Sequence, residues 1–292
     1  RVAELSAEIG GDPARVQMFR YLGDPDRAVI GVILGDGTYD YRGNLGFTDN
    51  LVPPAMVLTG FGRYPSDISL GDLDSDGVPE VVVGRLPVKT AGELDAVLAK
   101  LRRREVAGRI GGRKAVLAAD VPGDAGDFIQ DSEALRSIFA AGFPVETIYN
   151  RDNVLEPVRA AVAQAFGEGP ALFNYAGHGA RDRFGNGYLV STDIAGLPAV
   201  ALPPLVVAMT CGAGQFGVPG FDCLGETLML RGDGGAAAVW SPSGFSLNAG
   251  AHVLNRAFAE VAVGSVKGDR LGDLIRRAMG LFRARGGDAL LG

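Results

Sequence analysis

Two short apolar segments, residues 171–175 and 205–210, constrain the fold of this chain more than any other feature. Neither shows the polar alternation of a half-exposed strand, and both are bounded by Gly or Pro. Such runs are typical of buried strands in a parallel sheet. Each run leads to a reactive side chain, because His178 lies between two glycines after the first run and Cys211 directly follows the second.

The positions of His178 and Cys211 favour a catalytic pair. Ligands of parallel α/β sheets bind in the crevice beyond the carboxyl ends of the strands, so we expect the imidazole and the thiol to meet there. Such a pair supplies the general base and the nucleophile of acyl transfer through a thioester. The alternative for each residue is a structural role, as for a buried, inert thiol. The other histidine, His252, falls within a helical pattern and is expected to be a helix residue.

The remaining chain alternates between predicted strands and helices. Strands that alternate with helices indicate a mostly parallel sheet covered on both faces, an α/β fold. Residues 43–70 are expected to form an extended loop, and the glycines at 108, 111 and 112 suggest a subdomain boundary. Thr90 and Glu93 form a capping box for a helix that runs to about residue 106. Further strands are predicted at residues 28–34, 81–83, 115–119 and 236–240, and further helices at 131–140, 154–166 and 223–230, with two more at the end of the chain.

Composition excludes several classes of protein. The net charge of -6 and the pI of about 5.1 argue against nucleic-acid binding, which relies on clustered Lys and Arg. No apolar run reaches the roughly 18 residues that a membrane-spanning helix needs, so no transmembrane segment is expected.

The cysteine region admits other interpretations. A disulfide between Cys211 and Cys223 competes directly with catalysis, because a nucleophile must stay free. Two cysteines and one histidine lack a recognisable zinc-ligand spacing. Residues 212–217 read G-x-G-x-x-G, but Pro219 follows where a dinucleotide-binding turn needs the start of a helix.

An acidic segment resembles the first half of a calcium loop. Asp72, Asp74 and Asp76 alternate there as calcium ligands do. A complete EF-hand is excluded, because Val83 stands where the loop needs its last Glu. An irregular calcium site that draws on these three residues or on Glu80 remains open, as does a solvated acidic turn.

Six segments carry a resemblance when they are taken in order. They are GDLDSDGVPEVVVGRLPVKT (71–90), NYAGHG (174–179), TCGAGQF (210–216), FDCLGETLML (221–230), GAAAVWSPSG (235–244) and RLGDLIRRAM (270–279). Together they are similar to the gingipain family of caspase-like cysteine peptidases. The resemblance implies a three-layer αβα sandwich with a mostly parallel central sheet in two adjoining subdomains. We place the N-terminal subdomain, which we expect to be truncated at its start, at residues 1–108. The catalytic subdomain with the C-terminal helices is expected at residues 109–292.

The resemblance also implies roles for individual residues. The main-chain N–H groups of Gly179 and Cys211 would form the oxyanion hole, and Asp120 would orient the catalytic histidine, as a shorter residue than the Glu of the best-known relatives. Asp131 falls where arginine-cleaving relatives carry the Asp of their primary specificity pocket, and Leu247 falls near the aromatic residue that lines it. The alternative for Asp131 is a helix cap, a position that suits Asp.

The sequence therefore predicts a cysteine endopeptidase that acts on polypeptides, with a preference for cleavage after Arg or Lys. A transpeptidase that uses the same Cys–His pair and a non-catalytic surface module are the alternatives. Catalysis is expected to need no cofactor, and calcium, where bound, to be structural. The resemblance implies export to the cell surface or beyond. The chain begins at Arg1 without a signal peptide, so we expect a processed segment with further flanking domains.

Overall fold

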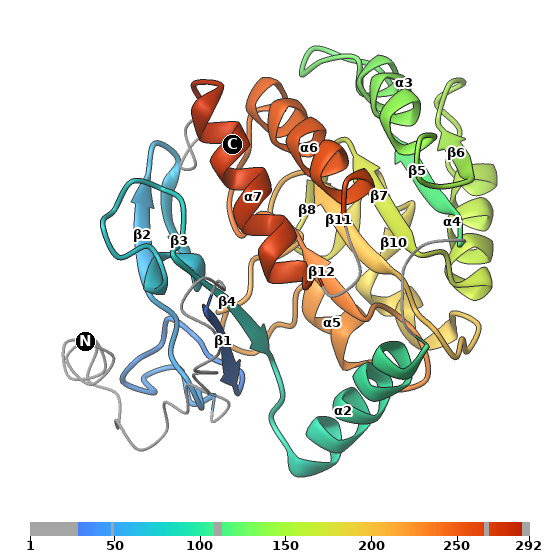
Figure 1. Ribbon diagram of the computed structural model, residues 1–292. Coiled ribbons are helices and arrows are strands. Elements are labelled where there is room, and N and C mark those ends of the chain that lie inside the picture. The colour runs from blue at the N-terminus through green and yellow to red at the C-terminus, as the bar shows by residue number, and fades with distance from the viewer. Residues whose placement is uncertain (1–28, 48–49, 108–112, 266–268, 288–292) are drawn as a thin grey trace.

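The computed structural model describes residues 29–47, 50–107, 113–265 and 269–287. Its centre is a five-stranded parallel sheet in the order β12-β11-β7-β5-β6 (Figure 1). The three central strands are wholly buried, although β7 includes the polar Asn174, and this confirms the predicted buried strands. The strands are β5 (Ala115–Ala119), β6 (Val145–Tyr149), β7 (Leu172–Ala176), β11 (Leu205–Met209) and β12 (Ala238–Trp240).

Helices cover both faces of this sheet. Alternate residues of each strand point to opposite faces, and this produces two separate cores. Phe173 and Val206 belong to the core with α4 (Glu156–Glu168) and α5 (Leu224–Leu230). Leu172 and Val207 belong to the core with α3 (Phe128–Phe139), α6 (Asn248–Val263) and α7 (Leu271–Ala284). The predicted three-layer αβα sandwich is confirmed.

A smaller parallel sheet joins β1 (Val29–Leu34) to β4 (Val81–Leu86). Next along the chain, α2 (Ala91–Val106) begins with the predicted capping box of Thr90 and Glu93. Its buried Val97 packs with Met229 of α5. The proposed subdomain boundary falls at residues 108–112, which lie outside the described residues, so the boundary remains a prediction.

Two regions hold short antiparallel pairs. The segment expected to be a loop contains a hairpin of β2 (Met56–Thr59) and β3 (Gly62–Pro65), followed by the 3₁₀ turn η2 (Ile68–Leu70). Directly after β7, the chain forms a small sheet from β8 (Gly179–Ala180), β9 (Arg183–Phe184) and β10 (Leu189–Val190), and then the 3₁₀ helix η3 (Ser191–Gly196). The loop prediction for residues 43–70 was wrong over the hairpin.

Three further predictions need correction. Strand β6 was missed, because it is an edge strand whose residues are only partly buried apart from Ile148. Helix α3 begins at Phe128, since Asp127 accepts a hydrogen bond from the main chain of Gln130 and caps it. Helix α4 ends at the left-handed Gly169, two residues later than expected. Across the described part of the chain, no helix has the length and apolarity needed to cross a membrane.

Candidate active site

The register of the central sheet brings His178 and Cys211 to the same level. Ala176 of β7 pairs with Met209 of β11, and each reactive residue lies two positions beyond its member of that pair. The strands are parallel neighbours, so both chains leave the sheet at one edge. The imidazole is exposed and the thiol is half-buried. A substrate can therefore reach both groups from solvent.

Two glycines allow the chain to pass closely beside this edge. A Cβ atom at Gly177, where φ is 157°, would lie 2.3 Å from the Cβ of Asp120. A Cβ atom at Gly179 would lie 2.2 Å from Oγ1 of Thr210, the residue before Cys211. The close packing around His178 therefore requires glycine at both positions. The sequence had suggested only that the backbone on either side of His178 is open.

The thiol of Cys211 faces a loop that follows β12. It donates to the carbonyl oxygen of Ser246 at 3.6 Å. Main-chain N–H groups of Gly212 and Gly214 donate to carbonyls of residues 244 and 242 in the same loop, at 2.8 and 3.0 Å. Cys223 caps α5 in a buried position, and both cysteines are free thiols. The alternative of a Cys211–Cys223 disulfide is therefore wrong.

Aromatic side chains hold His178. Its ring meets the ring of Phe128 edge to face, with centroids 5.3 Å apart. The hydroxyl of Tyr175 donates to the His178 carbonyl oxygen at 2.6 Å. Burial raises the pKa of Tyr175 well above its usual range, so this hydroxyl keeps its proton as a donor. The Tyr175 hydroxyl thus holds the main chain of His178, and the Phe128 ring holds its imidazole.

Asp120 lies directly after β5, beside His178, and is buried. Its carboxylate accepts from the main-chain N–H of His178 at 3.1 Å and from that of Val121 at 2.7 Å. It also accepts from the hydroxyl of Tyr188, which in turn accepts from the amide of Asn150 at 2.6 Å. Burial, followed by the hydrogen bond to Asp120, raises the pKa of Tyr188 to about 12. In this arrangement Asp120 fixes the backbone that carries the imidazole.

The N–H groups of Gly179 and Cys211 border the same edge. Gly185 donates to the His178 carbonyl at 2.8 Å, so the Gly179–Phe184 pair of the β8–β9 hairpin is a non-hydrogen-bonded pair. The N–H of Gly179 therefore points away from β9. The N–H of Cys211 donates to no main-chain acceptor among the described residues.

Asp131 lies in the first turn of α3, with Asp127 as the cap, so the helix-cap alternative for Asp131 is wrong. Its carboxylate faces the start of α6. One oxygen accepts from the amide of Asn248 at 2.8 Å, and the other lies 3.4 Å from Nδ1 of His252. The adjacent Leu247 is 52% exposed. Residues 246–248 thus connect the Cys211 thiol to the Asp131 carboxylate.

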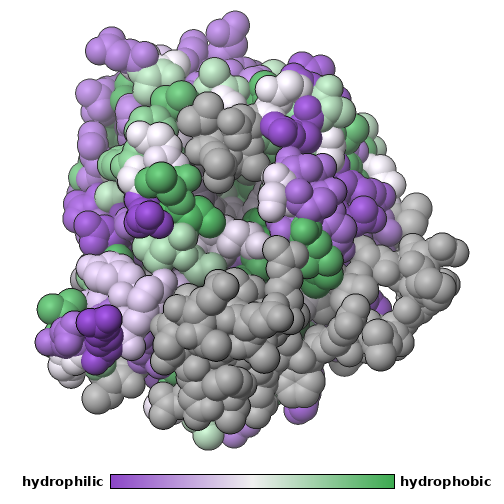
Figure 2. All heavy atoms as spheres, turned by 90° about the vertical axis from the view of Figure 1, so that its left-hand side faces the viewer, coloured by the Kyte–Doolittle hydropathy of each residue, from purple (hydrophilic) through white to green (hydrophobic). Residues whose placement is uncertain are grey.

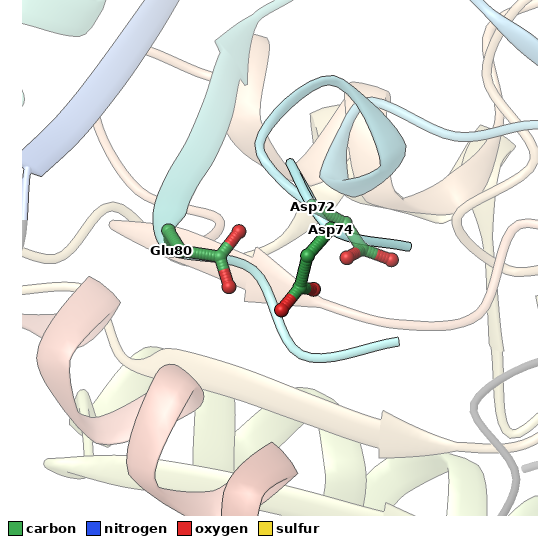
Figure 3. Close-up of side chains that lie close together, drawn as sticks. All are labelled: Asp72, Asp74 and Glu80. Carbon is green, nitrogen blue, oxygen red and sulfur yellow. The ribbon is translucent and has the colours of Figure 1, made fainter. Parts of the chain in front are cut away.

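The acidic segment gathers a slightly different set of carboxylates from the one predicted. Oxygens of Asp72, Asp74 and Glu80 lie within 4.8 Å of one another (Figure 3). Asp76 is not part of this group, and its carboxylate instead accepts from the main chain of Val78 at 2.7 Å. Hard carboxylate oxygens at this spacing are the donors that calcium prefers.

The fold and this edge of the sheet define a class, the caspase-like α/β proteins with an imidazole and a thiol just beyond the ends of neighbouring strands. The family model described as Peptidase family C25 matches residues 15–287. The chain belongs to this family of cysteine peptidases. No curated protein sequence matches it.

Solved structures agree on the fold. The crystal structure of the Arg-specific cysteine proteinase gingipain R matches with a TM-score of 0.72 at 19% identity, covering 89% of this chain and 60% of that one. A complex of the pro- and mature domains of RgpB from Porphyromonas gingivalis matches with a TM-score of 0.71 at 18% identity, covering 92% and 63%. The chain thus spans about three fifths of the length of these neighbours.

Several site residues had no signal in the sequence. Ser246 contacts the thiol through a main-chain carbonyl, which any residue type supplies. Tyr188 reaches Asp120 across 68 positions of sequence. Phe128 was assigned to a loop before α3, although it packs on the His178 ring. Each of these contacts depends on the fold as a whole.

Proposed function

We propose that this protein is a cysteine endopeptidase in which His178 activates Cys211. The observation that supports the proposal is the register of β7 and β11, because each residue follows the paired Ala176 and Met209 by two positions.

In the proposed reaction, the imidazole of His178 takes the thiol proton and Sγ attacks the carbonyl carbon of the scissile bond. The N–H groups of Gly179 and Cys211 would stabilise the oxyanion of the tetrahedral intermediate. The C–N bond then breaks, and the imidazolium gives its proton to the leaving amine. Water, activated by the same imidazole, hydrolyses the thioester and releases the acid product. Asp120 would act as a positioning residue through the backbone of His178.

For substrate choice, we propose that Asp131 pairs with an Arg or Lys side chain before the scissile bond, beside Leu247. A carboxylate that is fixed by Asn248 and partly removed from water suits a charge-assisted contact to a basic group. This specificity agrees with the Arg-specific proteinase among the structural neighbours. Catalysis itself requires no metal in this scheme.

Three further proposals complete the account, the first from the carboxylate cluster and the other two from the family. Calcium would bind at Asp72 and Asp74 with Glu80, in place of the predicted Asp76, and would brace the loop before β4. The protein would act outside the cell or at its surface, as its exported relatives do. Flanking domains would accompany it, as the complex of pro- and mature RgpB domains suggests.

Product analysis separates hydrolysis from the alternatives. Peptides with Arg, Lys or Ala before the scissile bond are incubated with and without a primary amine acceptor, and the products are identified by mass. A hydrolase releases the free acid even when the amine is present. Exclusive transfer to the amine would indicate a transpeptidase, and no cleavage of any peptide would indicate a non-catalytic module.

A further inference from the structure

A cavity of about 510 Å³ lies between the β2–β3 hairpin, the strands β11 and β12 and the helices α6 and α7, and its lining includes neither Cys211 nor His178. Its lining includes Met209, the last residue of β11, which lies two positions before Cys211. It also includes Ser246, whose carbonyl oxygen accepts from the thiol at 3.6 Å. Pockets that bind ligands typically measure about 300–1,000 Å³. Neither Asp131 nor Leu247 belongs to its lining, so this cavity is separate from the basic-residue pocket proposed above.

The chemistry of the cavity is apolar inside and polar at the rim. Its lining also includes the partly or fully exposed Asp72, Asp76 and Arg283, which bring charges of both signs. A charged side chain buried among the inner groups would lose water without a partner, whereas an apolar one would gain from burial. The inner residues come from several separate elements and include Val57, Met209, Trp240, Leu254, Met279 and Phe282.

Exposed hydrophobic side chains border its mouth. Phe245 is 60% exposed and Leu58 is 63% exposed, and both line the cavity. The ring of Phe245 meets those of Phe61 and Tyr64 edge to face, at centroid distances of 6.0 and 6.2 Å. Figure 2 looks onto the side of the molecule that carries β2 and β3, where hydrophobic atoms lie open among polar ones. Exposed aromatic side chains that contact one another at the mouth of a cavity favour a binding site.

We propose that this cavity is a second substrate pocket, which takes an aromatic or large aliphatic side chain of the polypeptide bound at Cys211. The proposal rests on the proposed peptidase function. Continuity with the reaction centre identifies the occupant, because Phe245 directly precedes the residue that contacts the thiol. A substrate polypeptide held in extended form across Cys211 passes Ser246, which is part of the cavity lining. One of the substrate side chains near the scissile bond then lies over the mouth of the cavity.

The test uses internally quenched peptides that share the best residue before the scissile bond. Phe or Ser is placed in turn at each of three positions on either side of the cleavage point. Wild type is expected to prefer Phe over Ser by about tenfold or more in kcat/KM at one position, the discrimination that a hydrophobic pocket supplies. Phe245→Ala should reduce this ratio several-fold, chiefly by lowering kcat/KM for the Phe peptide.

Two further variants sharpen the test. Leu58→Ala, on β2, should also lower the Phe preference, and it serves in place of Phe245→Ala if that variant does not fold. Phe47→Ala is the matched control, because Phe47 is an aromatic residue, 45% exposed, outside the cavity lining. It should keep the full preference.

The outcomes separate the two proposals. Efficient cleavage with no Phe preference at any position, or an equal preference in wild type, Phe245→Ala and Leu58→Ala, overturns the pocket alone. Absence of cleavage for every peptide overturns the peptidase function on which the pocket rests.

Discussion

His178 and Cys211 stand at matching positions beyond two hydrogen-bonded parallel strands, each two residues past the Ala176–Met209 pair. The strand register thus sets the relative position of two residues that are 33 positions apart in the sequence. The His178 ring packs against the ring of Phe128, and the Cys211 thiol donates to the carbonyl oxygen of Ser246.

The first prediction concerns this pair. Cys211→Ala and His178→Ala should each lower kcat/KM by several orders of magnitude, and the double variant should be little worse, because members of one catalytic unit are strongly non-additive. Steady-state hydrolysis of a fluorogenic peptide measures this effect. Cys223→Ser is the control and should keep most activity, since Cys223 is buried and burial raises its pKa well above the usual range. A double variant whose loss equals the product of the single losses would argue against a unit.

The second prediction concerns Asp131. Removing one partner of a buried charge pair typically costs about 2–5 kcal/mol, which corresponds to roughly 30-fold to several thousand-fold at about 1.4 kcal/mol per decade. Asp131→Asn should lower cleavage after Arg by at least the smaller factor and spare any slow cleavage after uncharged residues. Asp127→Asn on the same helix is the control, because Asn caps helices as well as Asp. An unchanged Arg preference in Asp131→Asn would refute the pocket role.

The third prediction concerns calcium. If the ion binds at Asp72, Asp74 and Glu80, a chelator should lower the melting temperature of the protein more than it lowers the initial rate at room temperature. Scanning calorimetry with and without chelator measures the effect, and Glu80→Gln should reduce the response. A melting curve that does not respond to chelator, together with no calcium by elemental analysis, would restore the alternative of a solvated turn.

The fourth prediction concerns Glu226 of α5. Burial, reinforced by the charge of Asp36, raises the pKa of Glu226 from 4.5 to about 8. Between these values the native state holds a proton that the unfolded state releases, so this group's contribution to stability falls as pH rises from about 4.5 through 8. Glu226→Gln cannot ionise, and it keeps an oxygen that can accept from the main chain of Cys223, as Glu226 does at 2.8 Å.

The measurement is the melting temperature of wild type and Glu226→Gln from pH 5 to 9. The variant should gain relative to wild type as pH rises toward 8 and hold that gain above it. Glu93→Gln is the matched control, because Glu93 holds the same N3 position in the capping box of α2. Its curve should run parallel to that of wild type. Parallel curves for Glu226→Gln as well would contradict the account.

The sequence allowed prediction of the elements whose signal is local. Unbroken apolar runs located β5, β7 and β11, and the spacing of Thr90 and Glu93 located the start of α2, because burial and capping each depend on residues near in sequence. The edge strand β6 lacked such a run, since only Ile148 of its residues is fully buried. The β2–β3 hairpin was hidden for the same reason, because most of its residues stay partly exposed.

The candidate site divides in the same way. His178 and Cys211 could be predicted from the sequence because each lies just after a buried strand. The partners of Asp120 and Asp131 could not, because Tyr188 and Asn248 reach them only after distant segments have packed. The acidic cluster shows an intermediate case. Alternation pointed to Asp72, Asp74 and Asp76, whereas the course of the loop brings Glu80, the further candidate, close to Asp72 and Asp74.

The most direct measurement of the central claim is covalent labelling with a peptidyl acyloxymethyl ketone that carries Arg at its terminal position. The labelled protein is weighed intact and then digested to map the modified residue. The account predicts one label per chain, on Sγ of Cys211, and strong loss of labelling in His178→Ala. A label on Cys223, or full peptidase activity in Cys211→Ala, would contradict it.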